Sequence, residues 1–390
     1  MLQPTGNHAR LVYSVLRGTG HDAAAPEHVR RSWMRCVHEY GLDPESRVQP
    51  AVLSRQEFAA HKERNAGLVA FADAEMGRLY RQLAGSGHSI ILTDRDGVLL
   101  SYYGDPSFRG AATRAGLLPG ALWSERAGGT NGMGTCLLER RPLIVHRDQH
   151  FLARNTGLTC CAAPIFDHRG ELMAVLDASG ESDRAQQHTL VLVTMSAQMI
   201  ESRLFLHRFR DAFVVRFHSR PELLGTSSEG ILALDAAGAV AAADRNALFQ
   251  LGCKAKDELI GAPLERAFNV SLPALVGRSR RSSFHPSPIY EARQGGRFFA
   301  VAQEPQPADF ADLAQEPCSG AGRAASAAAP DGTESLNALE RAEREALLEE
   351  LERARGNISH VARKLGMGRN TVYRTMQRLG IRWPKRAPAH

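Results

Sequence analysis

Histidine, cysteine and aspartate residues that could do chemistry occur between positions 146 and 177. His146 and His150 are four residues apart, and the adjacent Cys160 and Cys161 follow. Imidazole and thiolate groups bind zinc, so a metal site is one interpretation. The stretch His-Arg-Asp-Gln-His lacks the Glu of a zinc-protease motif, and histidines that serve as hydrogen-bonding groups are the favoured alternative. We therefore expect no metal and no cofactor.

The two cysteines and Asp177 each allow two interpretations. Adjacent thiols could respond to oxidants, but buried cysteines usually behave as small apolar residues. Asp177 ends an apolar stretch, where its carboxylate could orient a polar ligand group or close a turn. An enzyme built on His146, His150 and Cys160 is a weak alternative, because no set of nucleophile, base and orienting group stands in a supporting motif.

The stretch Gly-Gly-Thr-Asn-Gly-Met-Gly at 128–134 is dense in glycine. Glycine permits tight turns and a close approach of the backbone to a ligand. The segment either shapes a ligand site or forms plain turns. It does not match a dinucleotide-binding fingerprint, and no lysine of the chain follows a glycine, which excludes a Walker A phosphate loop.

The end of the chain is strongly basic. Residues 355–390 contain nine Lys or Arg and no Asp or Glu, whereas residues 340–352 contain six Glu. Two short helices are predicted at 358–365 and 369–379, with Asn357 as the first helix's N-cap and Gly366 at its left-handed end. Helices joined by such a turn are typical of a helix-turn-helix, although an ordinary hairpin with a solvated basic face is the alternative.

In a helix-turn-helix the second helix enters the major groove of DNA. Arginine reads guanine there and asparagine reads adenine, while hydroxyl groups suit phosphates. We predict the following DNA contacts: Ser359, Arg369, Asn370, Thr371, Tyr373, Arg374 and Arg378.

The elements that must position these groups indicate an α+β multidomain chain. Helix and strand signals alternate over 61–205, with strand–turn–strand units at 89–102 and 162–177 and a helix from about 184 to 217. The scheme repeats more weakly afterwards. We expect the following segments: a helical segment at 1–60, an α/β domain at 61–205, a second at 206–303, a flexible Pro/Ala/Gly/Ser-rich linker at 304–335 and an all-α segment at 336–390.

Composition is that of an ordinary globular protein. The formal net charge is +6, and the hydrophobic fraction is 43%. Six cysteines without regular spacing do not indicate a disulfide framework. No signal-peptide core is evident, and the most apolar stretch, 189–200, is too short to span a membrane. We expect a cytoplasmic protein that makes no membrane contact.

Two stretches carry a resemblance to a known family. Residues 32–44, SWMRCVHEYGLDP, and the stretch from Trp123 to 180 resemble the leader and the GAF-type sensor of acetoin-catabolism regulators. The resemblance implies an antiparallel sheet flanked by helices, with a small-molecule cavity on one face. The resemblance also implies a sensor that holds no metal. The candidate ligand contacts are Trp123, Thr130, Asn131, Cys136, His146, His150, Thr159, Cys160 and Asp177.

Two further segments resemble modules of the same regulators. Residues 218–303, with EGILALDAAGAVAAADRNALFQLG, are similar to a PAS domain in which alanine replaces larger residues; dimerisation or relay is favoured over ligand binding. Residues 357–380 resemble the Fis-type helix-turn-helix, except that Gly368 stands where Ser or Asp commonly caps the second helix. Such modules act as dimers, and a leucine-rich helix at 336–351 is the candidate interface.

Relatives with this sensor and tail usually carry an AAA+ ATPase between them, which acts on polymerase bearing the nitrogen-type sigma factor. Here only the linker at 304–335 occupies that place. The resemblance implies an ATP-independent transcription regulator that is not an enzyme. Its expected partners are double-stranded DNA, a small-molecule effector, a second copy of the chain, and RNA polymerase or a related regulator. The alternative is a sensory adaptor that associates with a full-length activator.

Overall fold

The computed structural model describes residues 6–18, 25–104, 107–182, 186–282, 285–293 and 295–305, together with Leu351, His360 and Val361. The chain divides into two compact units, 1–318 and 319–390. The description below concerns the first unit. Apart from these isolated positions, the predicted linker beyond residue 305 and the predicted C-terminal helices lie outside the described residues.

The N-terminal segment contains helices between Asn7 and Glu39. Its elements are α1 (Asn7–Arg17), α2 (Glu27–Met34) and the π-helical turn η1 (Arg35–Glu39). Val12, Val29 and Trp33 are buried and form one apolar cluster with Phe151 of the following domain. Burial of such side chains stabilises the packed state by about 1.5–3 kcal/mol each, so these helices are fastened to the sensor-like domain.

The next domain is built on a five-stranded antiparallel sheet in the order β2-β1-β5-β4-β3. The last strand in the sequence, β5, is therefore the central one. The strands are β1 (His88–Asp94), β2 (Leu99–Tyr103), β3 (Leu143–His146), β4 (Thr159–Phe166) and β5 (Leu172–Gly180).

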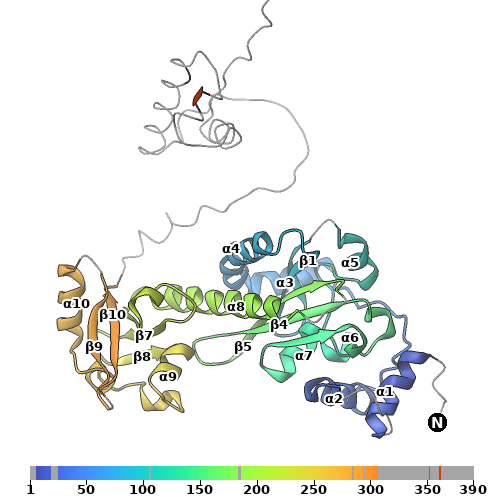
Figure 1. The fold of residues 1–390 in the computed structure, drawn as a ribbon, viewed down its shortest axis with the longest axis horizontal. Helices are drawn as coiled ribbons and strands as arrows, with labels where there is room; N and C mark the ends of the chain where they lie inside the picture. Colours follow the sequence, from blue (N-terminus) through green and yellow to red (C-terminus); the bar gives the residue numbers. More distant parts are fainter. Residues whose placement is uncertain are drawn as a thin grey trace, which may run out of the picture. The chain divides into compact units, whose positions relative to one another are not determined.

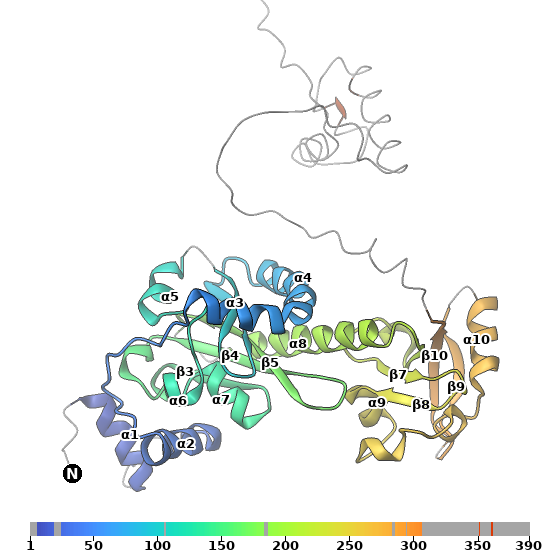
Figure 2. The ribbon, with the colours of Figure 1, turned by 180° about the vertical axis from the view of Figure 1, so that it is seen from behind.

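Alternation along the strands gives this sheet two apolar faces. Ile90 and Cys161 join one cluster with helices α4 and α8, whereas Ile91 and Cys160 join another with α5 and α7. Successive side chains of a strand point to opposite faces, so both faces are covered by helices. The flanking helices are α3 (Arg55–Arg64), α4 (Ala66–Gln82), α5 (Arg109–Ala115), α6 (Glu125–Gly128), α7 (Gly132–Glu139) and α8 (Gln187–Arg208). In Figures 1 and 2, α6 and α7 lie next to α2.

The helix predicted from 184 to 217 is too long and must be corrected. Helix α8 ends at Arg208, and residues Phe213–His218 form strand β6. β6 pairs with β7 on one side and β10 on the other. Those two ladders decide the conformation, and Val215 and Phe217 face one apolar cluster while Val214 faces another, as successive side chains of a strand do.

The second domain has another five-stranded antiparallel sheet, in the order β8-β7-β6-β10-β9. Here the first strand in the sequence, β6, is central, so this domain does not simply repeat the first. The rings of Phe217, Phe268 and Phe298 meet edge to face in its core, with centroids 4.9–5.7 Å apart. The remaining elements are β7 (Gly230–Leu234), β8 (Val240–Ala243), α9 (Arg245–Gln250), α10 (Leu272–Arg281), β9 (Ser287–Tyr290) and β10 (Arg297–Gln303).

Helix α8 serves both domains. Val193, Ala197 and Ile200 lie in the apolar cluster of the first sheet, while Phe205 packs with Val214 of the second. By length and composition α8 could cross a membrane. Its buried face is used against the two sheets instead, which is the behaviour of a core helix.

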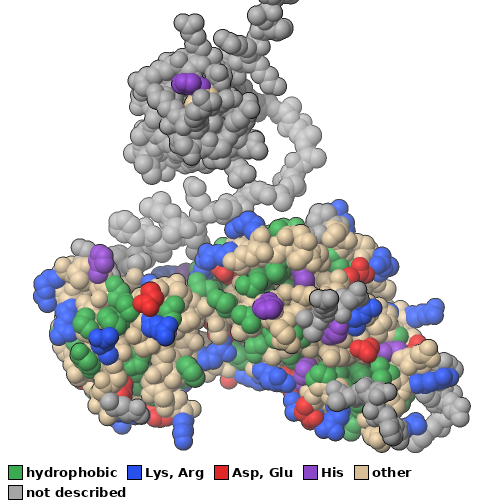
Figure 3. Space-filling model, viewed as in Figure 1, with side chains coloured by type: hydrophobic (Ala, Val, Ile, Leu, Met, Phe, Trp, Pro, Cys, Tyr) green, Lys and Arg blue, Asp and Glu red, His purple; other side chains and the backbone are tan. Residues whose placement is uncertain are grey.

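The described surface carries both signs of charge. In Figure 3, basic and acidic side chains are interspersed with hydrophobic ones over one face of the described region. The basic excess of the chain is not gathered there, in keeping with its concentration in residues 355–390.

Candidate functional site

The glycine-dense segment packs directly onto the sheet of the first domain. Asn131 is the N-cap of α7: its side-chain oxygen accepts a hydrogen bond from the Gly134 amide at 2.8 Å. A Cβ placed on Gly132 would lie 2.5 Å from both Oδ1 of Asp177 and Cβ of Cys160. Glycine is therefore needed for the close approach of helix to strand, and no phosphate is required to explain it.

Four buried polar side chains form a continuous chain beneath this segment. His150 Nε2 lies 3.4 Å from Cys160 Sγ, and Ser179 Oγ lies 3.1 Å from the same sulfur. Ser179 Oγ is also 2.5 Å from Oδ2 of Asp177. Each of the four side chains is at most 1% exposed. Three of them are candidate site residues from the sequence; the fourth, Ser179, is not, and it lies two residues after Asp177 on the same face of β5.

The protonation states of this chain follow from its geometry. His150 Nδ1 lies 2.9 Å from the carbonyl of Arg147, so it carries the proton and leaves Nε2 as an acceptor for the Cys160 thiol. Burial lowers the pKa of His150 to about 4, which keeps the ring neutral. Burial raises the pKa of the Cys160 thiol far above its ordinary value, so the reactive thiolate is suppressed.

Asp177 is the unusual member of the chain. Burial raises the pKa of its carboxyl to about 7, although the hydrogen bond from Ser179 opposes the shift. When Asp177 is protonated, it can donate to Ser179, Ser179 to Cys160, and Cys160 to His150, so that each donor has one acceptor. Its other oxygen, Oδ1, has no hydrogen-bond partner among the residues that the structure describes. A buried, unpaired oxygen is costly and calls for a functional explanation.

The other predicted ligand contacts are held by their neighbours. Trp123 Nε1 donates to the Gly116 carbonyl at 3.2 Å, and Cys136 Sγ lies 3.4 Å from the Arg141 carbonyl. His146 Nδ1 and Thr159 Oγ1 are 2.9 Å apart. Thr130 Oγ1 lies 2.6 Å from Ser32 Oγ. The structure thus brings Cys160, His150 and Asp177 together, while the remaining candidates lie around them.

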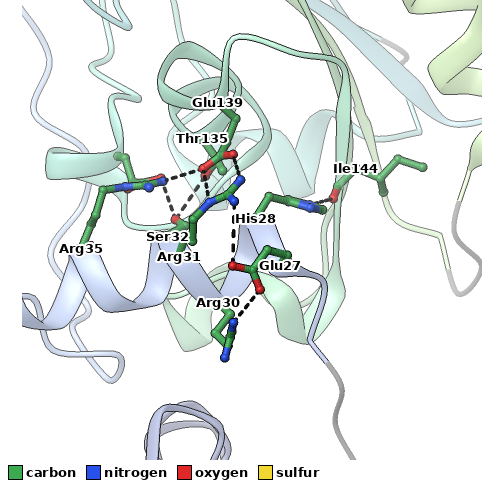
Figure 4. A network of polar contacts seen from close by, with 10 residues as sticks. Glu27, His28, Arg30, Arg31, Ser32, Arg35, Thr135, Glu139 and Ile144 are labelled. Carbon is green, nitrogen blue, oxygen red and sulfur yellow. Dashed lines mark hydrogen bonds and ion pairs between the residues drawn. The ribbon is translucent and has the colours of Figure 1, made fainter.

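The N-terminal helices hold this region through a polar network, which Figure 4 shows from close by. Arg35 of η1 donates to Glu125 of α6 at 2.6 Å and to Glu139 of α7 at 3.3 Å. Ser32 donates to Glu125 at 2.6 Å, and Arg31 pairs with Glu139. Both helices that flank the glycine segment are therefore fastened to residues 31–35. The sequence analysis assigned no role to these residues, although 32–36 lie in the leader stretch.

In the described part of the chain, His146 and His150 belong to no group of three or more side chains that could share one ion, although His150 contacts Cys160. Among the described residues, the group of acidic, His or Cys side chains close enough to share an ion consists of His61, Asp94 and Asp96. His61 Nδ1 is 2.6 Å from Asp94 Oδ2, and Asp94 Oδ1 accepts from the amides of Asp96 and Val98. These bonds explain the group as a closure of the β1–β2 turn.

The predicted DNA contacts, from Ser359 to Arg378, lie outside the described residues. Comparison with known proteins covers that segment as well. Residues 68–204 match the GAF domain, and residues 338–379 match the family described as bacterial regulatory protein, Fis family. The chain pairs a GAF domain with a Fis-type helix-turn-helix. The GAF domain thus contains the buried chain that ends at Asp177.

Two curated relatives of the chain are named as regulators of acetoin metabolism. The acetoin catabolism regulatory protein of Cupriavidus necator is 37% identical over 247 residues, which are 62% of this chain and 36% of that protein. AcoR of Bacillus subtilis, an acetoin dehydrogenase operon activator, is 28% identical over 47% of this chain and 30% of its own length. The chain spans about a third of the length of these curated relatives.

A solved structure is similar over a wider range. The Escherichia coli DhaR(N)–DhaL complex contains a chain that matches 72% of this protein and all of its own length, with 16% identity and a TM-score of 0.44. The expectation of a GAF-type fold and a Fis-type helix-turn-helix is confirmed by the family matches, whereas the PAS-like assignment of 206–303 stays a prediction.

Proposed function

We propose that this protein is a sequence-specific, DNA-binding transcription regulator whose GAF domain responds to a small molecule. The observation that carries the proposal is the presence of both matched segments in one chain. The nine basic and no acidic residues of 355–390 support it, because such a segment suits a polyanion. We place the protein in the cytoplasm as a homodimer, in which two recognition helices reach half-sites about 34 Å apart.

The effector that best suits the GAF domain is a small neutral molecule with a hydroxyl group. Asp177 Oδ1 is buried and without a partner, so it can accept a hydrogen bond from such a group. Two relatives are named for the catabolism of acetoin, which carries a hydroxyl. Because Gly132 is in close contact with Asp177, effector entry requires α7 to move away from β5. That movement would strain the polar network that joins α6 and α7 to the N-terminal helices.

We further propose that the regulator works without an ATPase motor of its own. The segment between the second domain and the matched helix-turn-helix, residues 306–337, has neither the length nor a phosphate loop for one. The protein then acts by occupying a site or by recruiting polymerase rather than by remodelling it.

Fluorescence anisotropy with the DNA upstream of its own gene tests this function. The full chain should bind this fragment more tightly than a shuffled fragment, acetoin should change the affinity, and no ATP should be hydrolysed. A chain that binds no fragment but associates with a full-length activator would instead support the sensory adaptor. ATP turnover would contradict the motor-free mechanism.

A further inference from the structure

A pocket of about 370 Å³ lies where α8 passes from the GAF domain to the second domain. It is bounded by the β4–β5 turn, by α8 and by the start of α9. Pockets of 300–1,000 Å³ are the usual size for small ligands. This junction pocket is separate from the chain of buried groups that ends at Asp177, since none of those four side chains lines it.

Cationic side chains from both domains converge in the junction pocket. The guanidinium carbons of Arg140, from the GAF domain, and Arg245, from the second domain, lie 5.5 and 5.2 Å from the centre of the Phe166 ring. Arg140 donates to the Gly170 carbonyl at 2.8 Å. A Cβ on Gly170 would lie 3.8 Å from Nζ of Lys256. The positively charged groups of Arg140 and Lys256 therefore both lie close to Gly170.

The acidic side chains of the pocket are already engaged. Glu201 pairs with Arg245 at 2.7 Å and accepts from the Phe166 amide. Asp244 accepts from the amides of Ile231 and Ala247. Asp167 accepts from the amides of Arg169 and Glu171 at 2.8 Å, within its own turn.

Arg140 and Lys256, in contrast, lack a close counterion. Their hydrogen bonds go to the neutral carbonyls of Gly170 and His168. None of the ion pairs within 4 Å in the described part of the chain contains either residue. Burial lowers the pKa of Lys256, and the carboxylates of Asp167, Asp244 and Glu171 oppose this shift only in part. A half-buried ammonium group of this kind gains stability from a bound anion.

The backbone conformation of Arg140 also supports a ligand site in the junction pocket. This residue has φ of 51° at the end of α7, a left-handed conformation in which glycine is the ordinary choice. A side chain there carries backbone strain, and residues under such strain gather at ligand-binding positions. The strained conformation places the guanidinium against Gly170 and Phe166.

We propose that the junction pocket binds a small organic anion. Its carboxylate or phosphate group lies beside Gly170 between Arg140 and Lys256, and its apolar part lies against Phe205 and Leu248. Because Arg140 belongs to the GAF domain and Lys256 to the second domain, the bound anion ties the two together. This ligand is distinct in place and charge from the neutral effector proposed above.

Thermal shift and calorimetry on the full chain test the proposal with three probes: benzoate, inorganic phosphate and neutral benzamide. Benzoate or phosphate at millimolar concentration should raise the melting temperature saturably, and benzamide should not. The first two arms distinguish an organic carboxylate from a free phosphate. Lys256→Met should weaken anion binding by at least about tenfold, the factor that about 1.4 kcal/mol represents.

Arg169→Gln is the matched control, because Arg169 is exposed on the same β4–β5 turn and does not line the pocket. It should bind the anion as the unchanged protein does. Arg140→Met provides an independent variant if Lys256→Met does not fold. The proposal is overturned if neither anion binds saturably, if benzamide binds as well as benzoate, or if removing the charge leaves binding unchanged.

Discussion

At the scale of single residues, Asp177 should make the stability of the GAF domain depend on pH. Its folded pKa is raised from 3.8 to about 7, so the folded state holds a proton that the unfolded state has lost. Stability is therefore highest near pH 4 and falls as the pH rises toward 7, by about 4 kcal/mol at most. Asp177→Asn should flatten this slope and make the protein more stable than the unchanged chain at pH 8.

Urea denaturation at pH 5 and pH 8 measures that difference. Part of the slope should remain in the variant, because burial also raises the pKa of Asp244 to about 7. Asp148→Asn, at an exposed position of the same domain, should leave the slope unchanged. An unchanged slope in Asp177→Asn would mean that this carboxyl does not titrate in the range its burial implies.

Two ion pairs on the N-terminal helices allow a direct comparison of buried and exposed charge. Glu125 is 1% exposed in its side chain and bonds to Arg35, whereas the Arg30–Glu27 pair, also close, is 57% and 55% exposed. Arg35→Met leaves a buried carboxylate without its cation and should reduce stability by about 3–5 kcal/mol. Arg30→Met should change it by about 0–1 kcal/mol. Chemical denaturation checks both, and equal effects would contradict the burial of Glu125.

Residue types in the sequence identified several candidate site residues but not the residues that they contact. His150, Cys160 and Asp177 stood out by type, and they do lie in one chain of contacts. Ser179, Ser32 and Glu125 did not, because serine and glutamate are common and only folding brings residues so distant in sequence together. Nothing in the residue types indicated that Asp177 Oδ1 would lack a partner, since that depends on packing against Gly132.

At the scale of elements, the position of α7 depends on a glycine. A methyl group on Gly132 would meet Asp177 Oδ1 and Cys160 Cβ at 2.5 Å, in a packed interior that cannot easily yield. Gly132→Ala should therefore destabilise the protein by about 1–3 kcal/mol. Gly67→Ala is the control, because Gly67 lies in α4 with open space around it. That change should stabilise by about 0.4–1 kcal/mol, and the opposite order in thermal unfolding would refute the close approach of α7 to β5.

The elements themselves were predictable where their signals are local. The turns Asp-Arg-Asp-Gly and Asp-His-Arg-Gly correctly placed β1–β2 and β4–β5. Strand β6 was missed because no Gly or Pro separates α8 from Phe213–His218, so the segment reads as a continuation of the helix. Its conformation is decided by β7 and β10, and β10 lies about 80 residues further along the chain. Local propensity carries no information about that pairing.

At the scale of the whole molecule, α8 physically connects the GAF domain to the second domain. One continuous helix contributes Val193 and Ile200 to the core of the GAF domain and Phe205 to that of the second domain. Because α8 is part of both cores, a displacement of α8 in one core would also displace the side chains that it packs into the other. The junction pocket lies beside this helix, so an anion bound there would resist such a displacement.

Substitutions in the basic C-terminal segment distinguish two roles of its cations: contact with DNA bases and neutralisation of phosphate charge. Binding of the full chain to its DNA site should fall steeply with salt, by a slope of about 0.9 in the logarithm for each phosphate neutralised. Lys385 follows the second predicted helix within the acid-free segment 355–390, where a cation suits a phosphate contact. Lys385→Ala should therefore lower that slope by about one and weaken all sequences alike. Arg369→Ala should instead lose about 1–3 kcal/mol on the preferred sequence and relax the preference at one base position. Anisotropy titrations on matched and mismatched duplexes between roughly 50 and 200 mM salt, where this dependence is steep, measure both effects. If Arg369→Ala weakened every duplex equally, Arg369 would be a phosphate contact, and the reading of bases would have to rest on Asn370 and its neighbours in the second helix.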